Sequence, residues 1–386
     1  MTFTTQTGAN GVTSLLGTTG NDFDTIVNLP GNVEVAANTG DDTLDLGFGT
    51  NGEVYDNYEI VMGGDDDTVN LAGNGVLLNS FVQLDGNNEA VAGDDTFAMA
   101  DATTALINSE IRGLSGDDTF TLFNLQNSTV NGNANEDTID VTGAVASQIN
   151  GGSWADDITV EGDVLQSSIN GNKGTDTVVV GAGGRAGDDE LTDVSIYGGQ
   201  GDDTITSNGN ADSTGTLLSG DKGNDTITDG EADSTLNGGS GDDVLTAGEG
   251  ADTLTGGSGA DTFNFGNGDS VISDADTNSG FSSITDLSTA DTIAFQGFET
   301  GDTISNVNFG TGDAGDTLFA TLEDGNIFAG GVDVALITIS DQDTDFNGSY
   351  IAFNTARRGN DFTADDTVIE VNSIVGLTST NFEALA

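Results

Sequence analysis

The chain has 386 residues and is strongly acidic, with 65 Asp and Glu against 6 Lys and Arg and a formal net charge of −59. Such a surface repels the phosphates of nucleic acids and the headgroups of anionic membranes, so we expect no nucleic-acid partner and no membrane insertion. Histidine and cysteine are absent, which excludes disulfides, thiolate chemistry and the commonest general base. The remaining ligand atoms are oxygens, which suit hard cations, above all Ca²⁺.

Residues 1–19 form the first predicted element, a short N-terminal segment or cap. Its sequence, MTFTTQTGANGVTSLLGTT, has neither the basic start nor the apolar run of about 7–15 residues that a secretory signal peptide needs. Nowhere does the chain approach the roughly 18 consecutive apolar residues of a membrane-spanning helix. We therefore expect neither a cleaved N-terminal leader nor a membrane span.

Residues 20–265 form the second and largest predicted element, in which one short phrase recurs. The phrase has an Asp at its sixth place and a large apolar residue two places later. Successive Asp residues are 9 to 28 residues apart, and usually 18 or more. Aligned in this way, the sixth-place residues are Asp24, Asp42, Asp67, Asp95, Asp118, Asp137, Asp156, Asp176, Asp203, Asp225, Asp243, Asp252 and Asp261.

The residues around each Asp predict short strands. Apolar and polar residues alternate with period two in DTIDV and DDITV, and a second phrase such as NSTVNG (127–132) places an apolar residue just before each glycine-rich turn. No comparable window has the helical period. A fixed repeat of this size predicts an all-β fold: a parallel β-roll or β-helix solenoid of about 18–20 or more residues per coil, closed by a C-terminal β-rich cap.

Glycine and Asp at fixed places of a turn are suited to holding a cation. Glycine lets the backbone curl its carbonyl oxygens inward, and the Asp adds a carboxylate. Because Ca²⁺ takes about 6–8 oxygen ligands, one turn cannot supply them, whereas two neighbouring turns can hold an ion between them. The glycines that we expect to take part are Gly198, Gly199, Gly201, Gly220, Gly223, Gly238, Gly239, Gly241, Gly248, Gly250, Gly256, Gly257 and Gly259.

Three copies of the phrase stand end to end in residues 238–264. They read GGSGDDVLT, AGEGADTLT and GGSGADTFN, and GGQGDDTIT (198–206) and GDKGNDTIT (220–228) match them. The copies resemble the nonapeptide GGxGxDxUx of the RTX, or haemolysin-type, calcium-binding repeat family. This resemblance implies a β-roll that holds several Ca²⁺ ions and folds outside the cell. It also implies type I secretion with an uncleaved C-terminal signal.

The resemblance is close for about 198–265 and looser for about 20–197. In the looser part other residues replace the first glycines, and GGSWADDIT (151–159) has Trp154 at a glycine place. Most coils carry the Asp phrase on one side only. We therefore expect a column of ions along one edge, an ion-free opposite edge, and ions on both edges in 238–264.

Residues 266–386 form the third predicted element, where the repeat fades. The stretch 281–304 resembles the strand-rich segment that closes such rolls in the family, and the alternating runs after it predict an antiparallel β region. We expect this element to cap the solenoid, to mediate assembly and to contain the secretion signal. Arg357 and Arg358 are interpreted as contacts to an acidic face of a neighbouring copy, with a solvated loop pair as the alternative.

We find no catalytic motif in the sequence. Without histidine, HExxH metal sites and Ser-His-Asp triads are excluded, so we predict that the protein is not an enzyme. A β-helix polysaccharide lyase that uses paired carboxylates or a basic residue is the least favoured option.

The predicted function is a secreted or cell-surface calcium-binding structural protein. It would self-assemble into an extracellular filament, sheath or surface layer. Its partners would be calcium ions and further copies of itself, with a cell-surface polysaccharide in addition. The alternative is a monomeric calcium-dependent adhesin, or an ice- or polysaccharide-binding module, for which outward Thr-x-Thr pairs occur only in patches.

Overall fold

The computed structural model has two compact units, Met1–Thr204 and Ile205–Ala386, which we call unit 1 and unit 2. Apart from one 3₁₀ turn, η1 (Ser379–Asn381), the regular structure of the described residues is entirely β. None of their helices is long and apolar enough to cross a membrane. The described residues are 4–7, 13–27, 32–47, 53–86, 93–100, 102–182, 189–266, 269, 281–296, 304–309, 328, 333–339, 348–354 and 366–385.

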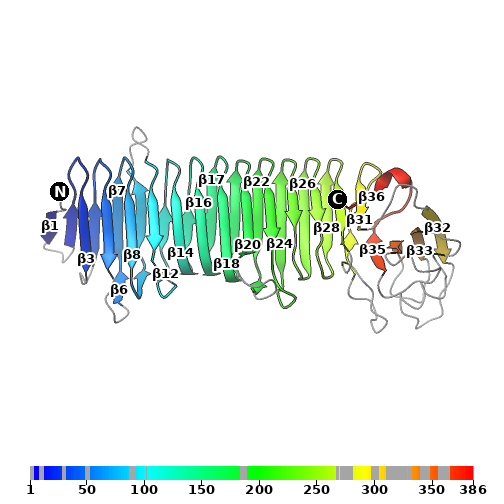
Figure 1. Cartoon of the computed structure of the whole chain (residues 1–386), viewed down its shortest axis with the longest axis horizontal. Helices are drawn as coiled ribbons and strands as arrows, with labels where there is room; N and C mark the ends of the chain where they lie inside the picture. Colours follow the sequence, from blue (N-terminus) through cyan, green and yellow to red (C-terminus); the bar gives the residue numbers. More distant parts are fainter. Residues whose placement is uncertain are drawn as a thin grey trace. The chain divides into compact units, whose positions relative to one another are not determined.

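Unit 1 consists of two stacks of strands, and successive coils contribute one strand to each (Figure 1). The first stack begins with an antiparallel pair and is parallel thereafter. Its strands, in order of pairing, are β1 (Thr4–Thr7), β2 (Thr13–Leu16), β4 (Val33–Ala36), β7 (Tyr58–Gly63), β10 (Phe81–Asp85), β13 (Glu110–Arg112), β15 (Thr129–Asn131), β17 (Gln148–Ser153), β19 (Ser168–Lys173) and β22 (Ser195–Gln200).

The second stack of unit 1 is parallel throughout. Its strands are β3 (Phe23–Val27), β5 (Thr43–Gly47), β8 (Thr68–Ala72), β11 (Thr96–Met99), β14 (Thr119–Gln126), β16 (Thr138–Val145), β18 (Asp157–Leu165) and β20 (Thr177–Ala182). Two short strands pair with the later halves of its longer strands: β12 (Ala105–Ile107) with β14, and β21 (Leu191–Thr192) with β18. Strand β9 (Gly75–Leu78) pairs with β12, and β6 (Glu53–Asp56) with β9. The parallel stacking confirms the predicted solenoid.

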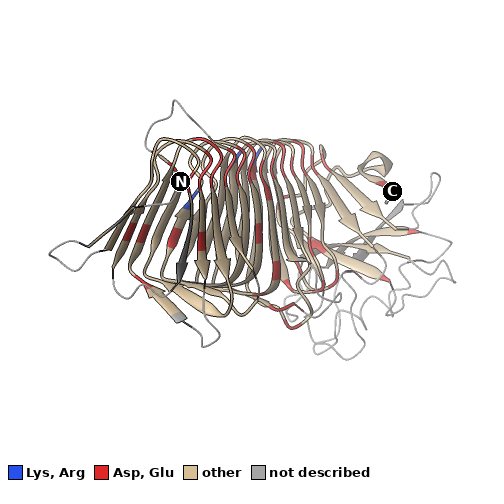
Figure 2. Ribbon diagram, turned by 60° about the vertical axis from the view of Figure 1, so that its left-hand side comes forward, with Lys and Arg blue, Asp and Glu red and all other residues tan. Residues whose placement is uncertain are grey.

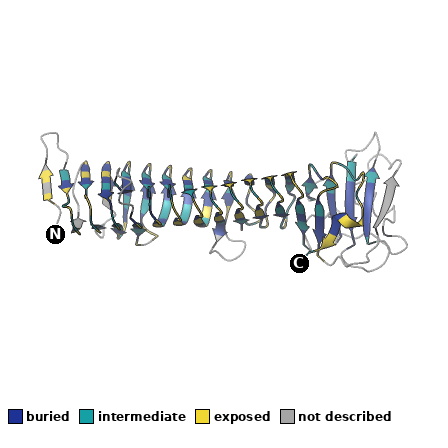
Figure 3. Ribbon diagram, turned by 90° about the horizontal axis from the view of Figure 1, so that it is seen from above, coloured by how far each residue is buried: buried dark blue, intermediate teal, exposed yellow. Residues whose placement is uncertain are grey.

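The core of unit 1 is a set of apolar ladders, and Figure 3 shows the buried positions that recur along its strands. Each ladder repeats one place of the coil, because the parallel register pairs equivalent residues. Ile111, Val130 and Ile149 follow one another in the first stack and are fully buried. Phe120 and Ile139 do the same in the second stack. Each fully buried side chain of this size contributes roughly 1.5–3 kcal/mol, so stability grows with the number of stacked coils.

Unit 2 begins with the same two parallel stacks of strands and ends in a different arrangement. One parallel stack contains β24 (Thr216–Lys222), β26 (Ser234–Ser240), β28 (Thr253–Ser258) and β30 (Ser283–Ile284). The other contains β25 (Thr226–Thr228), β27 (Val244–Thr246), β29 (Thr262–Phe265), β31 (Thr292–Phe295) and β36 (Phe382–Ala384). Strand β23 (Thr204–Ser207) lies at the division between the units.

The end of unit 2 is a β-rich cap in which antiparallel pairing appears. Strand β30 pairs with β35 (Thr367–Val371), which is followed in antiparallel order by β34 (Gly348–Phe353) and β33 (Val334–Ile339). Strand β32 (Ile304–Phe309) then pairs parallel with β33. The ring of Phe295 stacks on Phe353 at 4.7 Å between ring centroids. Aromatic packing of this kind joins the last coil to the cap.

Candidate metal site

A row of hydrogen bonds joins the sixth-place Asp residues of successive coils, and we call it the Asp row. Figure 2 shows the acidic residues gathered along the turns of one edge. The main-chain N–H of each Asp donates to Oδ1 of the Asp one coil later, at 2.6–2.9 Å in unit 1 and 2.8–3.1 Å in unit 2. Its members are Asp22, Asp42, Asp67, Asp95, Asp118, Asp137, Asp156, Asp176 and Asp203 in unit 1, and Asp225, Asp243, Asp261 and Asp291 in unit 2.

The second carboxylate oxygen, Oδ2, is left unsatisfied in most of the row. These side chains are buried, and their Oδ2 atoms are shielded from solvent and have no hydrogen-bond partner among the described residues. A buried polar atom without a partner is costly and in a native protein indicates a missing ligand or water. The residues concerned are Asp42, Asp67, Asp95, Asp118, Asp137, Asp156, Asp176 and Asp243.

Burial raises the pKa of these carboxylates, because it removes their ionised form from water. Desolvation, with a smaller contribution from nearby acids, raises the pKa of Asp118 to about 9 and that of Asp137 to about 8, although a backbone hydrogen bond lowers each in part. Desolvation is also the main cause that raises the pKa of Asp95 to about 7 and that of Asp243 to about 6. A column of buried carboxylates that resists ionisation requires positive charge at its side to stay ionised at neutral pH.

Glycine occupies three places of the turn for two different reasons. In residues 238–243 the second and fourth places have positive φ, +108° at Gly239 and +131° at Gly241, which residues with a Cβ rarely adopt. The first place faces the carboxylate, so that a Cβ on Gly238 would overlap Oδ2 of Asp243. The other predicted glycines fill the same places: Gly198, Gly220 and Gly256 the first, Gly199, Gly248 and Gly257 the second, and Gly201, Gly223, Gly250 and Gly259 the fourth.

Main-chain carbonyl oxygens line the turn beside the carboxylates. A Cβ on Gly241 would overlap the carbonyl oxygen of Gly223 one coil earlier, so fourth-place carbonyls face the following coil at close range. The fourth-place carbonyls of Trp154 and Gly174 accept no backbone hydrogen bond among the described residues. Within that same part of the chain, no three acidic side chains cluster closely enough to hold a metal by themselves. Carboxylate and carbonyl oxygens together form the ligand set that Ca²⁺ prefers.

The looser repeats keep the turn conformation without glycine. Leu114 and Asn133 take the second place with φ of +90° and +84°, and Trp154 takes the fourth with +88°. The carbonyl of Trp154 still faces Gly174 in the next coil. Departures from the motif in residues 113–156 therefore do not remove the turn, because neighbouring coils impose its shape.

The opposite edge of unit 1 carries serine where the first edge carries Asp. The hydroxyl of Ser128 accepts the main-chain N–H of Ser109 at 3.2 Å, and that of Ser147 accepts the N–H of Ser128 at the same distance. Serine closes the turn with a neutral acceptor and adds no charge. In unit 2 Asp252 holds this place, and its Oδ1 accepts the N–H of Ser234 at 2.9 Å. Asp252 therefore belongs to the second edge and not to the Asp row.

The first member of the predicted alignment is wrong by two residues. Strand register pairs Asp24 with Leu44, whereas Asp22 donates its N–H to Asp42. The side chain of Asp24 lies outside the described residues. The phrase DTI misled the alignment, and the spacing of Gly17 and Gly20 before Asp22 is the signal that identifies the correct residue.

The sequence alignment also missed three acids. Asp291 is the last member of the Asp row, in a phrase, ADTI, that repeats the earlier ADTL. Asp85 and Asp229 are also buried. Asp85 ends strand β10 and pairs in register with Gly63, at the second place of the turn. Asp229 follows strand β25, and its N–H donates to the carbonyl of Thr246, which puts it at the first place. Both residues deviate from the motif, so no motif search would find them.

Arg357 and Arg358 lie outside the described residues.

Acids at the fifth place form a second row that runs in the opposite direction. The N–H of Asp117 donates to Oδ1 of Asp94, one coil earlier, at 3.0 Å, and the N–H of Asp242 donates to Asn224 at 2.8 Å. The sixth-place side chain thus reaches to the preceding coil and the fifth-place side chain to the following one. The fifth-place acids are exposed, so this row is solvated while the Asp row is not.

Comparison with known proteins extends these observations. Among solved structures, the chain is similar to a hyperactive, Ca²⁺-dependent, β-helical antifreeze protein from an Antarctic bacterium, with 16% identity and a TM-score of 0.42 over 86% of this chain and 95% of the other. No curated protein was found to match. The family model of the RTX calcium-binding nonapeptide repeat (4 copies) matches residues 193–213, 219–254 and 237–272. Residues 193–213 and 219–272 therefore carry calcium-binding nonapeptide repeats of the RTX type.

Proposed function

We propose that this chain is a secreted structural protein whose stacked coils are stabilised by Ca²⁺ bound in the turns of the Asp row. The observation that carries the proposal is the column of buried Oδ2 atoms that find no hydrogen-bond partner in the described part of the chain, such as those of Asp118, Asp137 and Asp156. Bound calcium supplies positive charge and coordination to oxygen atoms that are otherwise desolvated without compensation.

The residues that would hold each ion come from neighbouring turns. The sixth-place carboxylates supply Oδ2, and the second- and fourth-place residues supply carbonyl oxygens. The first-place glycine leaves room for the carboxylate. A Cβ on Gly113, Gly132 or Gly151 would overlap Oδ2 of the sixth-place Asp in the same turn. The backbone bond to Oδ1 fixes the orientation of the carboxylate, so little further ordering is needed on binding.

The proposal assigns the protein a structural role that includes calcium-dependent self-assembly into a filament, sheath or surface layer. A net charge of −59 opposes association of identical copies, and bound cations reduce that repulsion. It assigns no catalytic role, because histidine and cysteine are absent from the sequence. Export by type I secretion is part of the same proposal, on the grounds of the family resemblance.

The alternative role, an ice-binding surface, has weaker support in the outward rows of the second stack. One row holds Thr in five consecutive coils, but the row beside it does not. The second row reads Asp45, Asn70, Ala98, Thr121 and Asp140. A regular Thr-x-Thr face is therefore absent from the described part of this stack.

The test is circular dichroism and electron microscopy of the purified chain at pH 7.5, in CaCl₂, in MgCl₂ or in chelator. Each is used at ~5 mM, which is well above the dissociation constants of calcium-sensor proteins. We expect polymers with calcium and none with chelator, and a urea unfolding midpoint, followed by circular dichroism, that is much lower in chelator than in calcium. An equal midpoint in the two buffers would overturn the calcium proposal. A folded but monomeric chain in calcium would overturn self-assembly alone and leave the adhesin alternative.

A further inference from the structure

The outward face of unit 1 contains a polar groove that spans three coils. Its volume is about 420 Å³, within the range of roughly 300–1,000 Å³ that holds small ligands. It lies on the outside of the first stack, away from the buried face, and we call it the Asn groove. Its lining residues are Asn131, Asn133, Asn150, Gly151, Gly152, Ser153, Asn172 and Lys173.

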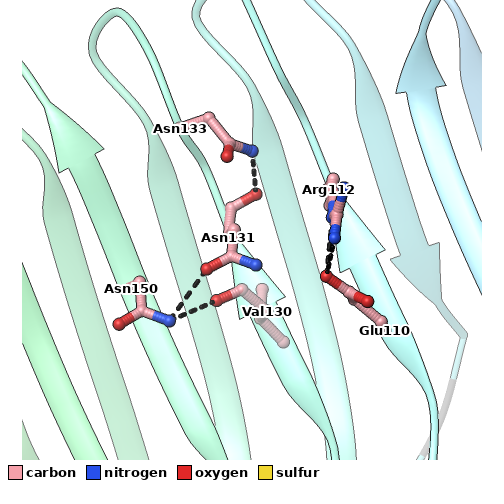
Figure 4. A network of polar contacts seen from close by, with 6 residues as sticks. All are labelled: Glu110, Arg112, Val130, Asn131, Asn133 and Asn150. Atoms are coloured by element: carbon pink, nitrogen blue, oxygen red, sulfur yellow. Dashed lines mark hydrogen bonds and ion pairs between the residues drawn. The ribbon is translucent and has the colours of Figure 1, made fainter.

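The strand register brings the carboxamides of the groove together. Asn131 and Asn150 are direct partners on adjacent strands β15 and β17, and the Nδ2 of Asn150 donates to Oδ1 of Asn131 at 2.8 Å (Figure 4). The Nδ2 of Asn133 donates to the carbonyl of Asn131 at 3.1 Å, as Figure 4 also shows. These bonds hold the side chains in place, so the groove is ordered before any ligand arrives.

Each carboxamide keeps one polar group without a partner among the described residues. Asn131 retains its Nδ2 donor, and Asn150 and Asn133 retain their Oδ1 acceptors. Lys173 adds an ammonium group that makes no ion pair within the described part of the chain. The groove therefore offers both donors and acceptors. A hydroxyl group both donates and accepts, so a hydroxyl-rich ligand matches this arrangement.

The groove differs from the rest of the surface in charge. None of its lining residues is acidic, in a chain with 65 Asp and Glu. On its N-terminal side, Arg112 precedes Asn131 in register, and its guanidinium is paired with Glu110 at 2.6 Å (Figure 4). Lys173 alone does not offset a surface of this charge toward a polyanion. The composition therefore favours an uncharged ligand over an acidic one.

The spacing of the groove suits a chain-like ligand. Neighbouring strands lie about 4.8 Å apart, so successive coils present equivalent side chains at a distance close to the length of one sugar ring. Trp154, the single Trp of the sequence, directly follows Ser153 of the groove and is 66% exposed. Exposed aromatic rings provide stacking surface for the apolar faces of sugars.

We propose that the Asn groove binds a neutral, hydroxyl-rich saccharide chain. Asn131, Asn133 and Asn150 are assigned to its hydroxyl groups, Lys173 donates to an oxygen of the same chain, and Trp154 stacks at the rim. The proposal requires unit 1 to be folded but does not depend on self-assembly. It adds to the proposed structural role a means of attaching the protein to a polysaccharide surface.

The test uses the full chain in CaCl₂ on an array of neutral hexose and N-acetylhexosamine oligosaccharides, with oligogalacturonate as the acidic arm. Isothermal titration with the best ligand then compares variants. We expect binding to at least one neutral oligosaccharide, with a change in Trp154 fluorescence. Asn150→Ala and Lys173→Gln should each weaken binding at least about tenfold, as the loss of a well-formed hydrogen bond predicts.

Two matched variants serve as controls. Asn237→Ala and Lys222→Gln remove the same residue types in unit 2, outside the groove, and should change affinity less than about twofold. Circular dichroism in the same buffer separates loss of folding from loss of binding. Absence of binding to every neutral oligosaccharide by the folded chain would overturn the proposal. So would binding only to the acidic arm, or binding that Asn150→Ala leaves unchanged.

Discussion

The main-chain N–H of Asp118 donates a 2.9 Å hydrogen bond to Oδ1 of Asp137, 19 residues later in the chain. Asp137 donates in the same way to Asp156. One oxygen of each carboxylate is therefore fixed by the backbone of the preceding coil, and the other is left for a ligand. A substitution that keeps the first oxygen and changes the second can separate the structural contribution of the residue from its contribution to calcium binding.

Asp118→Asn is that substitution, and we expect opposite effects with and without calcium. Its side-chain oxygen still accepts the N–H of Asp95, but it carries no charge. In chelator the variant should be more stable than the parent by on the order of 2 kcal/mol, because burial raises the pKa of Asp118 to about 9 and ionisation is unfavourable there. In saturating calcium it should be less stable than the parent.

Urea unfolding followed by circular dichroism measures both differences. Asp117→Asn, which changes the exposed neighbour, is the control and should be nearly neutral in chelator. Equal destabilisation of Asp118→Asn in both buffers would contradict the separation of roles between the two oxygens.

Stability of the calcium-free chain should fall as the pH rises. The folded pKa values of the buried row carboxylates are raised, to about 6 for Asp156 and about 9 for Asp118, above an unfolded value near 3.8. Between these values the folded state binds more protons than the unfolded state, so unfolding becomes easier by about 1.4 kcal/mol per pH unit for each such group. The loss begins above about pH 4 and is complete above the folded pKa values.

Urea midpoints in chelator at pH 5, 7 and 9 measure this trend. With calcium the trend should be weakened or reversed, because coordination uses the ionised carboxylates. A calcium-free chain that gains stability from pH 5 to pH 9 would show that the row carboxylates are not desolvated as the structure indicates.

Gly113→Ala should disrupt both the turn and calcium binding. The added Cβ would overlap Oδ2 of Asp118 and the carbonyl oxygen of Gly132, so the carboxylate must leave its position. We expect a loss of about 1–3 kcal/mol in calcium, typical of overpacking at a rigid site. Gly20→Ala, where an added Cβ meets no atom within 4 Å, is the control. Thermal unfolding with calcium measures the difference. Equal melting temperatures for the two variants would show that the first-place glycine is not needed to make room for the Asp118 carboxylate.

Trp154→Gly should stabilise the fold although it removes a large side chain. Trp154 adopts a φ of +88° and is 66% exposed, so the strain of the backbone exceeds the small packing contribution. Relief of a left-handed conformation is worth about 1 kcal/mol. Urea unfolding by circular dichroism tests this. A destabilised Trp154→Gly variant would show that the ring makes a contact that outweighs the strain.

Asp252→Ser should lower the calcium stoichiometry without disrupting the solenoid. Serine holds the equivalent place in the coils of unit 1, and its hydroxyl can still accept the N–H of Ser234. The carboxylate of Asp252 resists ionisation, because burial raises its pKa to about 8. Titration calorimetry should detect fewer ions per chain and an unchanged β spectrum. An unchanged stoichiometry would mean that the second edge binds no calcium through this residue.

The sequence predicted the repeat, the parallel stack and most of the Asp row, because these depend on a local pattern that each coil restates. Two adjacent coils must match in register to bury Ile139 on Phe120, so a periodic apolar residue is sufficient to fix the pairing. Motif reasoning was least reliable where the pattern broke. It placed the first Asp at Asp24, because the following apolar residues looked the same.

The remaining features could not be read from a motif, because they arise between coils. Asp85 and Asp229 become unusual only when a neighbouring coil buries them. The Asn groove brings together residues such as Asn131 and Lys173, which are 42 positions apart and share no motif that would mark them as neighbours. Coil lengths vary with loop insertions, so the sequence alone does not show which polar side chains become neighbours.

The equal spacing of Asp118, Asp137 and Asp156 has a consequence for how such a chain changes over generations. Residues 119–137 form a complete coil of 19 residues, and strand β14 pairs with β16 at seven equivalent positions. Unequal recombination that removes or duplicates this segment would restore the same neighbours on both sides. The length of the stack can therefore drift while the chemistry of every remaining turn is inherited unchanged, which makes length itself a trait open to selection.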